Sequence, residues 1–501
     1  MWRIVRRLAK DSAIYGAANA ATAVLAVLLV PLYTHKLTAS EFGRYSLVVM
    51  IYSLLSVLAD CGMTNGVARY YFDEAQTGDP NTATVYRKSL VTTALVTTAC
   101  ISLLLSLACY WLADFVSWHA FGASTYGPLL RIVGVTLLFR GFTTAPMIYL
   151  RVTGRAVAYG LLSVLQVTVF LGFTLLLVLV LDWGVPGILY SQLIATAGWA
   201  VCAVVAIARD LSVGPRVRIA KDLLRFGLPF LPALPLMWVV DVSDRYLLER
   251  YVSTHEVGLY SLGYRFGQVM VLLVTAVTLA WPPLSYRILG EANAETIYSR
   301  ITSLYMAGAG LLWLGLSLFS REMVVLLSPE EFHAAAIYIP PVAFGYLLYG
   351  LYVLSVTGLG VAKRIGPLSW VTLVAGIVNV GLNMWLIPRL GALVAAYTTI
   401  IAYAILAGGC LLVSQQFYRI PYRYREWAVL LVGMIALCAL PTLLPAMSWL
   451  ASVLLRLGLL TAYLGLVFFS GVVRRDEMLV LAGALSEPAP RTPPVSASSR
   501  S

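Results

Sequence analysis

Charged residues are scarce in this sequence. They make up 12% of the 501 residues, against about 25% in ordinary soluble domains, and this scarcity excludes a soluble globular enzyme. Hydrophobic residues make up 60% and fall into blocks of about 20, the length that crosses a hydrocarbon core of about 30 Å, which excludes a disordered chain. The blocks, such as residues 161–181, are continuous and do not alternate, so we predict membrane-spanning helices and not a β-barrel.

Metal-ligating and nucleotide-binding patterns are also missing. The six cysteines lie inside apolar blocks without the paired spacing of a zinc site or a redox disulfide, so we interpret them as small core residues. No G-x-x-x-x-G-K-[ST] run occurs, which argues against an ATP-driven exporter. The formal net charge is +12, but Lys and Arg lie in short loops, so this charge indicates membrane topology and not a nucleic-acid partner. We expect no metal and no cofactor.

Apolar blocks between charged or Pro/Gly-rich breaks predict fourteen spanning helices. Most of the 35 Lys and Arg residues fall in alternate loops and in the two termini, which places both termini in the cytoplasm by the positive-inside rule. The loops on the other side are short and hold no room for a catalytic domain. The predicted spans are 11–34, 44–67, 89–112, 126–149, 156–181, 185–208, 223–247, 256–284, 299–320, 334–360, 366–388, 391–415, 427–446 and 449–473.

An internal repeat organises these helices. Residues 41–47 (Glu-Phe-Gly-Arg-Tyr-Ser-Leu) return in altered form as residues 256–262 (Glu-Val-Gly-Leu-Tyr-Ser-Leu), and each copy opens the second helix of a six-helix set. Two six-helix lobes in parallel order imply an axis along the membrane normal and a substrate path between the lobes. We therefore predict an all-α polytopic membrane protein with the architecture of a transporter.

The predicted parts follow from that repeat. They are an N-terminal lobe (1–210), a C-terminal lobe (211–424), two appended helices (425–475) and a cytoplasmic tail (476–501). The end of the tail, from about residue 486, is rich in Pro and Ser with no apolar face, so we expect it to be disordered.

The fourteen-helix plan, the stretch Asp244-Arg245-Tyr246-Leu247-Leu248 and residues 257–262 resemble a known family. It is the polysaccharide-synthesis (O-antigen-type flippase) branch of the multidrug/oligosaccharidyl-lipid/polysaccharide exporter superfamily. The resemblance implies a V-shaped transporter, not an enzyme, with two lobes around a central cavity. It implies flipping of an undecaprenyl-pyrophosphate-linked oligosaccharide from the cytoplasmic to the outer leaflet of the inner membrane. Coupling to H+ or Na+ is implied too, with membrane lipids and other polysaccharide-assembly proteins as candidate partners.

An anionic head group crossing a low-dielectric core needs cations, so intramembrane ionisable residues are the candidate site residues. Arg265 lies about 14 Å into the eighth helix, and we predict that it binds the head group; the alternative is a structural pair with Asp241 or Asp244. On the seventh helix, Asp241, Asp244 and Arg245 share one face. We predict head-group binding for Arg245 and ion coupling or gating for the two aspartates; the alternative is an internal salt bridge.

Arg140 and Asp60 are predicted at similar depths in the fourth and second helices, about 21 and 24 Å from the outer ends. We predict that they pair, that Arg140 contributes to head-group binding and that Asp60 takes part in ion coupling; the alternative is a static interhelical bridge. Pro229, Pro232 and Pro235 interrupt the seventh helix and predict a hinge there. The alternative is the ordinary frequency of proline in membrane helices.

Two other functions compete with flipping. A drug/cation antiporter of the same superfamily would have a more acidic cavity, whereas four of the intramembrane charges here belong to Arg. A membrane glycosyltransferase or polymerase would need an acidic pair and a sizeable external loop. The only acidic pair of that kind is Asp241-x-x-Asp244, which lies within a predicted helix, and the external loops are short.

Overall fold

The structure is a computed structural model, and it describes residues 29–73, 80–211, 214–228, 233–289, 293–362, 364, 366–445 and 447–472. These residues form helices joined by turns, and no strand occurs among them. The expectation of an all-α membrane protein is confirmed, since eleven helices are long and apolar enough to cross a membrane, or twelve if the bent pair Thr254–Gly267 and Met270–Thr278 counts as one span.

The predicted number of fourteen spans is not reached within the described residues. The twelve correspond to the predicted spans other than the first and the seventh. Of the predicted span 11–34, only residues 29–34 are described. The seventh is represented by α10 (Ala233–Tyr251), which carries five charged residues over its length. This helix of 19 residues is long enough to cross a membrane, but it carries more charge than an ordinary spanning helix.

The first half of the chain forms α2 to α9. Small residues let the helices approach closely here: a side chain on Gly141 of α6 would overlap Ser102 of α4. The elements are α2 (Ala39–Asp60), α3 (Met63–Asp73), α4 (Pro80–Trp111), α5 (Ala113–Phe121), η2 (Ser124–Tyr126), α6 (Gly127–Val152), α7 (Ala156–Thr174), the π-helical turn η3 (Leu175–Val180), α8 (Gly184–Ile207), η4 (Ala208–Asp210) and α9 (Val217–Gly227).

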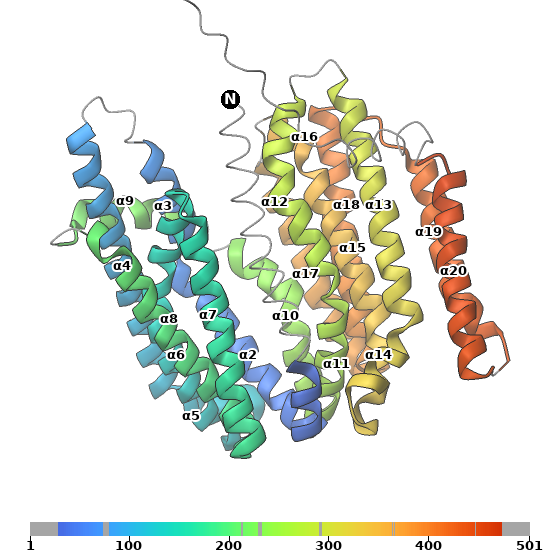
Figure 1. Cartoon of the computed structure of the whole chain (residues 1–501), viewed down its shortest axis with the longest axis horizontal. Helices are drawn as coiled ribbons and strands as arrows, with labels where there is room; N and C mark the ends of the chain where they lie inside the picture. The colour runs from blue at the N-terminus through green and yellow to red at the C-terminus, as the bar shows by residue number, and fades with distance from the viewer. Residues whose placement is uncertain are drawn as a thin grey trace, which may run out of the picture. The chain divides into compact units, whose positions relative to one another are not determined.

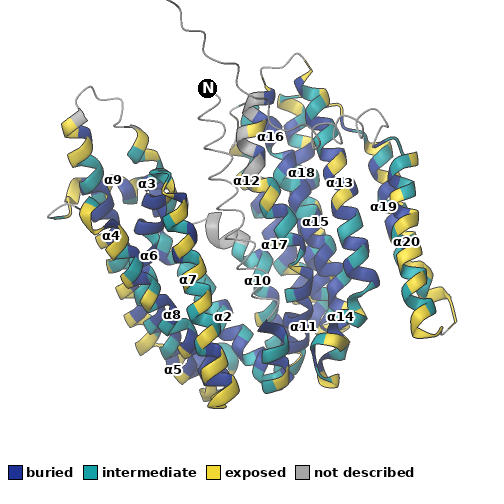
Figure 2. Cartoon of the chain, viewed as in Figure 1, coloured by how far each residue is buried: buried dark blue, intermediate teal, exposed yellow. Residues whose placement is uncertain are grey.

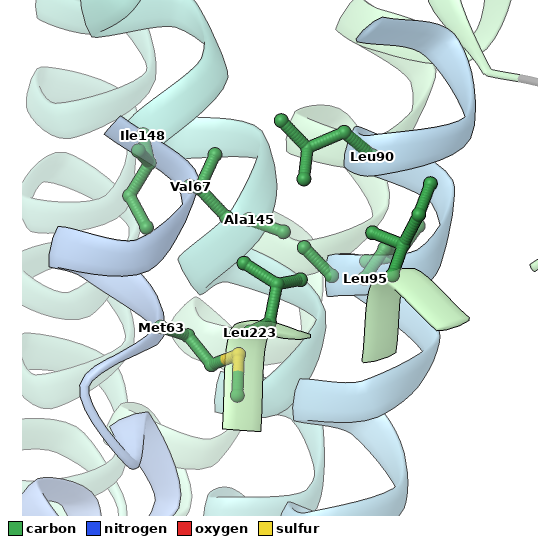
Figure 3. Close-up of a cluster of buried hydrophobic side chains, with 9 residues drawn as sticks. Met63, Val67, Leu90, Leu95, Ala145, Ile148 and Leu223 are labelled. Carbon is green, nitrogen blue, oxygen red and sulfur yellow. The ribbon is translucent and has the colours of Figure 1, made fainter. Parts of the chain in front are cut away.

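The α9 helix is amphipathic and packs on this half by its apolar face. Ile219 and Leu223 are buried in a cluster that includes Met63 and Val67 of α3 and Leu90 of α4 (Figure 3). Lys221 and Asp222, which lie between them, are exposed and charged, because a period of 3.6 residues places them on the other face of the helix. This short helix therefore connects the two halves without crossing the apolar core.

The second half follows the same plan. In it, α10 packs on α17, and α15 packs on both α11 and α18 (Figure 1). The elements are α10, α11 (Thr254–Gly267), α12 (Met270–Ile288), α13 (Ala294–Leu318), α14 (Ser320–Leu327), η6 (Glu330–Tyr338), α15 (Ile339–Ser355), α16 (Thr357–Val361), α17 (Gly366–Leu390) and α18 (Leu393–Phe417).

The chain divides into two compact units. The larger comprises residues 1–291 and 316–419, and the smaller comprises residues 292–315 and 420–501. In the smaller unit, α19 (Tyr424–Ala439), η7 (Leu440–Leu443) and α20 (Trp449–Phe469) accompany most of α13. The Trp427 indole N–H donates to the Ser303 hydroxyl at 2.9 Å, and the Tyr463 hydroxyl donates to the Ala307 carbonyl at 3.3 Å. The lobe boundaries at residues 210 and 424 stay predictions.

Many apolar side chains lie on the surface of the helices, as a membrane protein requires. Leu161 of α7 and Phe469 of α20 are 67% and 87% exposed, and exposed positions line both helices in Figure 2. Such surfaces would be unfavourable in water, at about 25 cal/mol per Å², but they match lipid chains. Buried polar residues on other helices, by contrast, mark the interior where a site can be built.

Candidate functional site

The two copies of the internal repeat contact each other directly. Gly43 of α2 and Gly258 of α11 lie where the helices cross: a side chain on Gly43 would overlap the Thr254 carbonyl, and one on Gly258 would overlap the Ala39 carbonyl. Thr254 precedes Gly258 by four positions, and Ala39 precedes Gly43 by four positions as well. The contact is therefore reciprocal, as an axis relating the two copies requires.

Each copy begins with a capped helix. Thr38 caps α2, and the Glu41 side chain accepts from the Thr38 backbone N–H at 3.0 Å, which completes a capping box. Ser253 caps α11 by accepting from the Glu256 backbone N–H at 3.2 Å. The Glu256 carboxylate instead accepts from the Tyr338 hydroxyl at 2.8 Å. The same sequence signal thus starts both helices at the crossing.

Further hydrogen bonds join the two halves near this crossing. The Tyr126 hydroxyl donates to Glu249 at 2.9 Å, and the Ala39 backbone N–H donates to Glu331 at 2.8 Å. The Trp238 indole N–H of α10 donates to the Ser53 hydroxyl of α2 at 2.7 Å. Together with the glycine contact, these bonds join the first half to the second half within the larger unit.

Arg265 lies in the last turn of α11 and is surrounded by aromatic rings. Its guanidinium carbon is 5.1 Å from the ring centre of Tyr33, 5.2 Å from that of Phe42 and 5.7 Å from that of Tyr45. The three rings also contact each other, with centres 5.8 to 6.3 Å apart. No carboxylate of the described residues forms an ion pair with Arg265. We call Tyr33, Phe42 and Tyr45 the aromatic cage.

Arg245 is held differently. Its guanidinium forms an ion pair with Asp244 at 3.5 Å and donates to the Asp241 carbonyl at 3.2 Å. The Tyr260 hydroxyl donates to the same Asp244 carboxylate, which is 1% exposed. Arg245 also lies 4.3 Å from the ring centre of Tyr264. Its charge is therefore compensated inside the second half, as in the internal salt bridge that the sequence left open.

Asp241 accepts hydrogen bonds from three tyrosines. Its Oδ1 atom lies 2.5 Å from the Tyr264 hydroxyl, 3.0 Å from that of Tyr346 and 3.2 Å from that of Tyr403. These donors come from α11, α15 and α18, so the carboxylate joins four helices.

The predicted pair of Asp60 and Arg140 is not among the ion pairs of the described residues. Asp60 accepts from the Thr64 hydroxyl at 2.6 Å. Both residues are partly buried. The structure thus leaves the Arg140 charge without a carboxylate in the part of the chain that it describes, as it does the charge of Arg265.

Two of the predicted hinge prolines, Pro229 and Pro232, lie outside the described residues, and Pro235 lies in the first turn of α10. Breaks occur at two other places. Cys61 (φ 46°) and Gly62 (φ 70°) separate α2 from α3 in the left-handed region, and α11 and α12 meet at an angle of 50°. A side chain on Gly62 would crowd the Gly227 backbone of α9, so glycine is needed there.

Sequence reasoning missed most of the polar partners. It named no individual tyrosine, although six of them contact Arg265, Asp241 or Asp244. It also missed Asn379 and Asn383, which are fully buried on α17, with Asn383 accepting from Thr398. Two Asn residues at i and i+4 in an apolar span were the available signal. No group of three or more His, Cys, Asp or Glu that could hold a metal occurs in the described part of the chain.

A family of known proteins matches this arrangement. The family described as "Polysaccharide biosynthesis protein" matches residues 8–289. The chain belongs to this family. The resemblance to a polysaccharide-synthesis family that was seen in the sequence is therefore confirmed. No curated protein sequence matches the chain.

Solved structures share the fold of this polysaccharide biosynthesis family member. The lipid II flippase MurJ in an inward closed conformation has a TM-score of 0.70 at 12% identity, over 91% of this chain and 99% of MurJ. An inward-facing multidrug resistance MATE transporter of the MOP superfamily has a TM-score of 0.66 at 16% identity, over 79% and 94% of the two chains. An outward-facing MATE transporter of the same superfamily has a TM-score of 0.59 at 15% identity, over 82% of this chain and 94% of that one. At these identities the likeness shows the fold.

Proposed function

We propose that this chain flips a lipid-linked oligosaccharide, carried on an undecaprenyl-pyrophosphate type of lipid, from the cytoplasmic to the outer leaflet of the inner membrane. The observation that supports it most is that Arg265 forms no ion pair among the described residues. A partly buried cation without a carboxylate is costly to keep in a membrane, and an anionic ligand offsets that cost. Membership of a polysaccharide biosynthesis family and the fold shared with the lipid II flippase MurJ support a lipid-linked glycan as the substrate class.

The structure supports different roles for the predicted cations. Arg265 and Arg140 carry charges without an ion-pair partner among the described residues, and we assign them to the pyrophosphate. Arginine suits this task because its guanidinium can form two parallel hydrogen bonds to a phosphate. Arg245 shares its charge with Asp244, so it holds the second half together.

Ion coupling is assigned to Asp241. Its carboxylate bonds to tyrosines from three other helices, so adding H+ or Na+ there changes contacts on all of them at once. A charge change that alters several interhelical bonds can bias a two-state element. Asp244 is buried and serves as the counter-charge of Arg245. We assign a gating role to Asp60, which lies at the break between α2 and α3.

The proposed transport follows alternating access. The contact of Gly43 with Gly258 closes the extracytoplasmic end, and the head group is bound from the cytoplasmic side. Opening of that contact then releases the lipid to the outer leaflet. Both termini lie in the cytoplasm in this scheme, as the positive-inside rule predicts.

Cells lacking this protein test the proposal. Surface polysaccharide is expected to fall while intact lipid-linked precursor accumulates on the inner leaflet, and Arg265→Ala should behave like the deletion. Arg131→Ala is the matched control, because Arg131 pairs with the exposed Asp114 at the protein surface, and such pairs contribute little. Unchanged surface polysaccharide would indicate drug export instead. Missing precursor would indicate an enzyme of glycan assembly.

A further inference from the structure

We infer that the aromatic cage is a positioning element of the head-group site and that this site forms only while α2 and α11 are packed together. The inference rests on the proposed function, because it takes Arg265 as a ligand of the pyrophosphate. Arg265 belongs to the second half, whereas all three cage residues belong to the first. The site is therefore shared between the halves, and its geometry depends on their contact.

Aromatic rings suit this role for a physical reason. They attract the face of a guanidinium through their quadrupole and supply no counter-charge, while the Tyr33 hydroxyl also accepts one hydrogen bond from Arg265. Arg245, by comparison, is neutralised by Asp244. The cage thus holds Arg265 in one orientation without neutralising it, and the guanidinium N–H groups that are not bonded to Tyr33 stay available to an anion.

The cage is rigid enough to position a side chain. Tyr33, Phe42 and Tyr45 are 1%, 0% and 8% exposed, and the Phe42 ring also contacts Phe332 of η6 edge-on at 6.2 Å. Packed side chains with few alternative rotamers fix the atoms that they touch. An Arg side chain without such contacts would lose conformational freedom on binding, so the cage raises affinity by preorganisation.

The position of the cage rings around Arg265 depends on the contact between the two repeat copies. Phe42 and Gly43 are adjacent in α2, and Arg265 follows Gly258 by seven residues, about two turns of α11. Separation of the two helices at the glycines would withdraw the rings from the guanidinium. Affinity for the head group is then high while this end is closed and lower once it opens, which favours release on the side that has opened.

Binding of farnesyl pyrophosphate to the purified full-length protein in detergent tests this inference. This probe carries the pyrophosphate and a prenyl chain but no sugar, and farnesol serves as the uncharged control. Arg265→Gln is expected to lower its affinity at least about tenfold, since hydrogen bonds to charged groups are lost. Tyr45→Leu is expected to lower it about fivefold, and Tyr45→Phe should restore most of that loss because the ring and not the hydroxyl contacts Arg265.

A second pair of variants tests the dependence on helix contact. Gly258→Ala is expected to lower affinity about as much as Tyr45→Leu, although it touches neither Arg265 nor the cage, because the new methyl group overlaps the Ala39 carbonyl. Gly172→Ala of α7 is the matched control, since a side chain there meets nothing within 4 Å. Thermal unfolding of each variant shows that the fold is retained.

The outcomes separate the inference from the proposed function. If Arg265→Gln weakens binding but Tyr45→Leu and Gly258→Ala do not, the cage and the helix contact have no positioning role, while the assignment of Arg265 stands. If Tyr45→Phe is as weak as Tyr45→Leu, the aromatic face is not the cause and the inference is wrong. If Arg265→Gln binds the pyrophosphate as tightly as the natural protein, both the inference and the proposed role of Arg265 fail.

Discussion

Gly43 and Gly258 occupy equivalent positions in the two copies of the repeat, and they are also neighbours in space. A side chain on Gly43 would lie 3.1 Å from the Gly258 backbone N, and one on Gly258 would lie 3.2 Å from the Gly43 backbone N. The motif that reveals the duplication is thus the place where the two halves meet. Small residues are needed at such a crossing because the helix backbones touch.

Replacement of Gly43 by alanine should destabilise the protein. The added methyl group overlaps the Thr254 carbonyl, and overpacking of this kind costs about 1 to 3 kcal/mol. Thermal unfolding in detergent measures the effect. Gly198→Ala is the control, since that position on α8 is open and alanine favours helix there. Equal unfolding temperatures for the two variants would contradict the crossing.

Loss of Asp244 should be more severe than loss of its whole ion pair. Asp244→Asn leaves the Arg245 charge buried without compensation, which costs about 3 to 5 kcal/mol. The double variant Asp244→Asn/Arg245→Met removes both charges and should recover much of the stability. Unfolding temperature and yield measure both. A double variant less stable than Asp244→Asn would show that Arg245 has another counter-charge.

Reversing the charges of Asp60 and Arg140 together should not restore the transport that either single reversal loses. The two residues form no ion pair in the described part of the chain, so Asp60→Arg/Arg140→Asp should transport no better than the worse single variant. Export of surface polysaccharide is the measurement. Rescue by the double variant would show that the pair forms in another state of the transport cycle.

Asp241→Asn should separate transport from head-group binding. It removes the charge that three tyrosine hydroxyls stabilise and with it the proposed response to H+ or Na+, so transport should fall at least about tenfold. Farnesyl pyrophosphate binding should change much less. Tyr403→Phe, which removes one of the three donors, should have a weaker effect in the same direction. Full transport by Asp241→Asn would exclude this residue from coupling.

Cysteine labelling should confirm the predicted orientation. In a variant with the six native cysteines replaced, a single cysteine at the exposed Glu330 should react with a membrane-impermeant maleimide in intact cells. One at the exposed Arg364 should react only after the membrane is opened. The reverse pattern would place both termini outside and would move the glycine crossing to the cytoplasmic end.

The membrane-spanning character and the repeat could be predicted because they depend on local sequence. Runs of apolar residues define spans whatever their partners, and Thr38-x-x-Glu41 and Ser253-x-x-Glu256 start helices by bonds within one turn. The rarity of charge in a membrane also marked Arg265, Asp241, Asp244 and Arg245 as residues of interest before any fold was available. The seventh span was harder to define, since α10 carries the charges of Asp241, Asp244 and Arg245.

Only the tertiary structure decided the partners of those residues. Two arginines of the predicted spans have opposite surroundings. Arg245 lies beside a carboxylate one residue away, whereas Arg265 lies among three rings from a segment more than 200 residues distant in the chain. Periodicity shows which face of a helix is apolar, but not which helix lies against it. That choice depends on close packing of surfaces from the whole chain, so whether a buried charge is compensated or left for a ligand cannot be determined from sequence spacing.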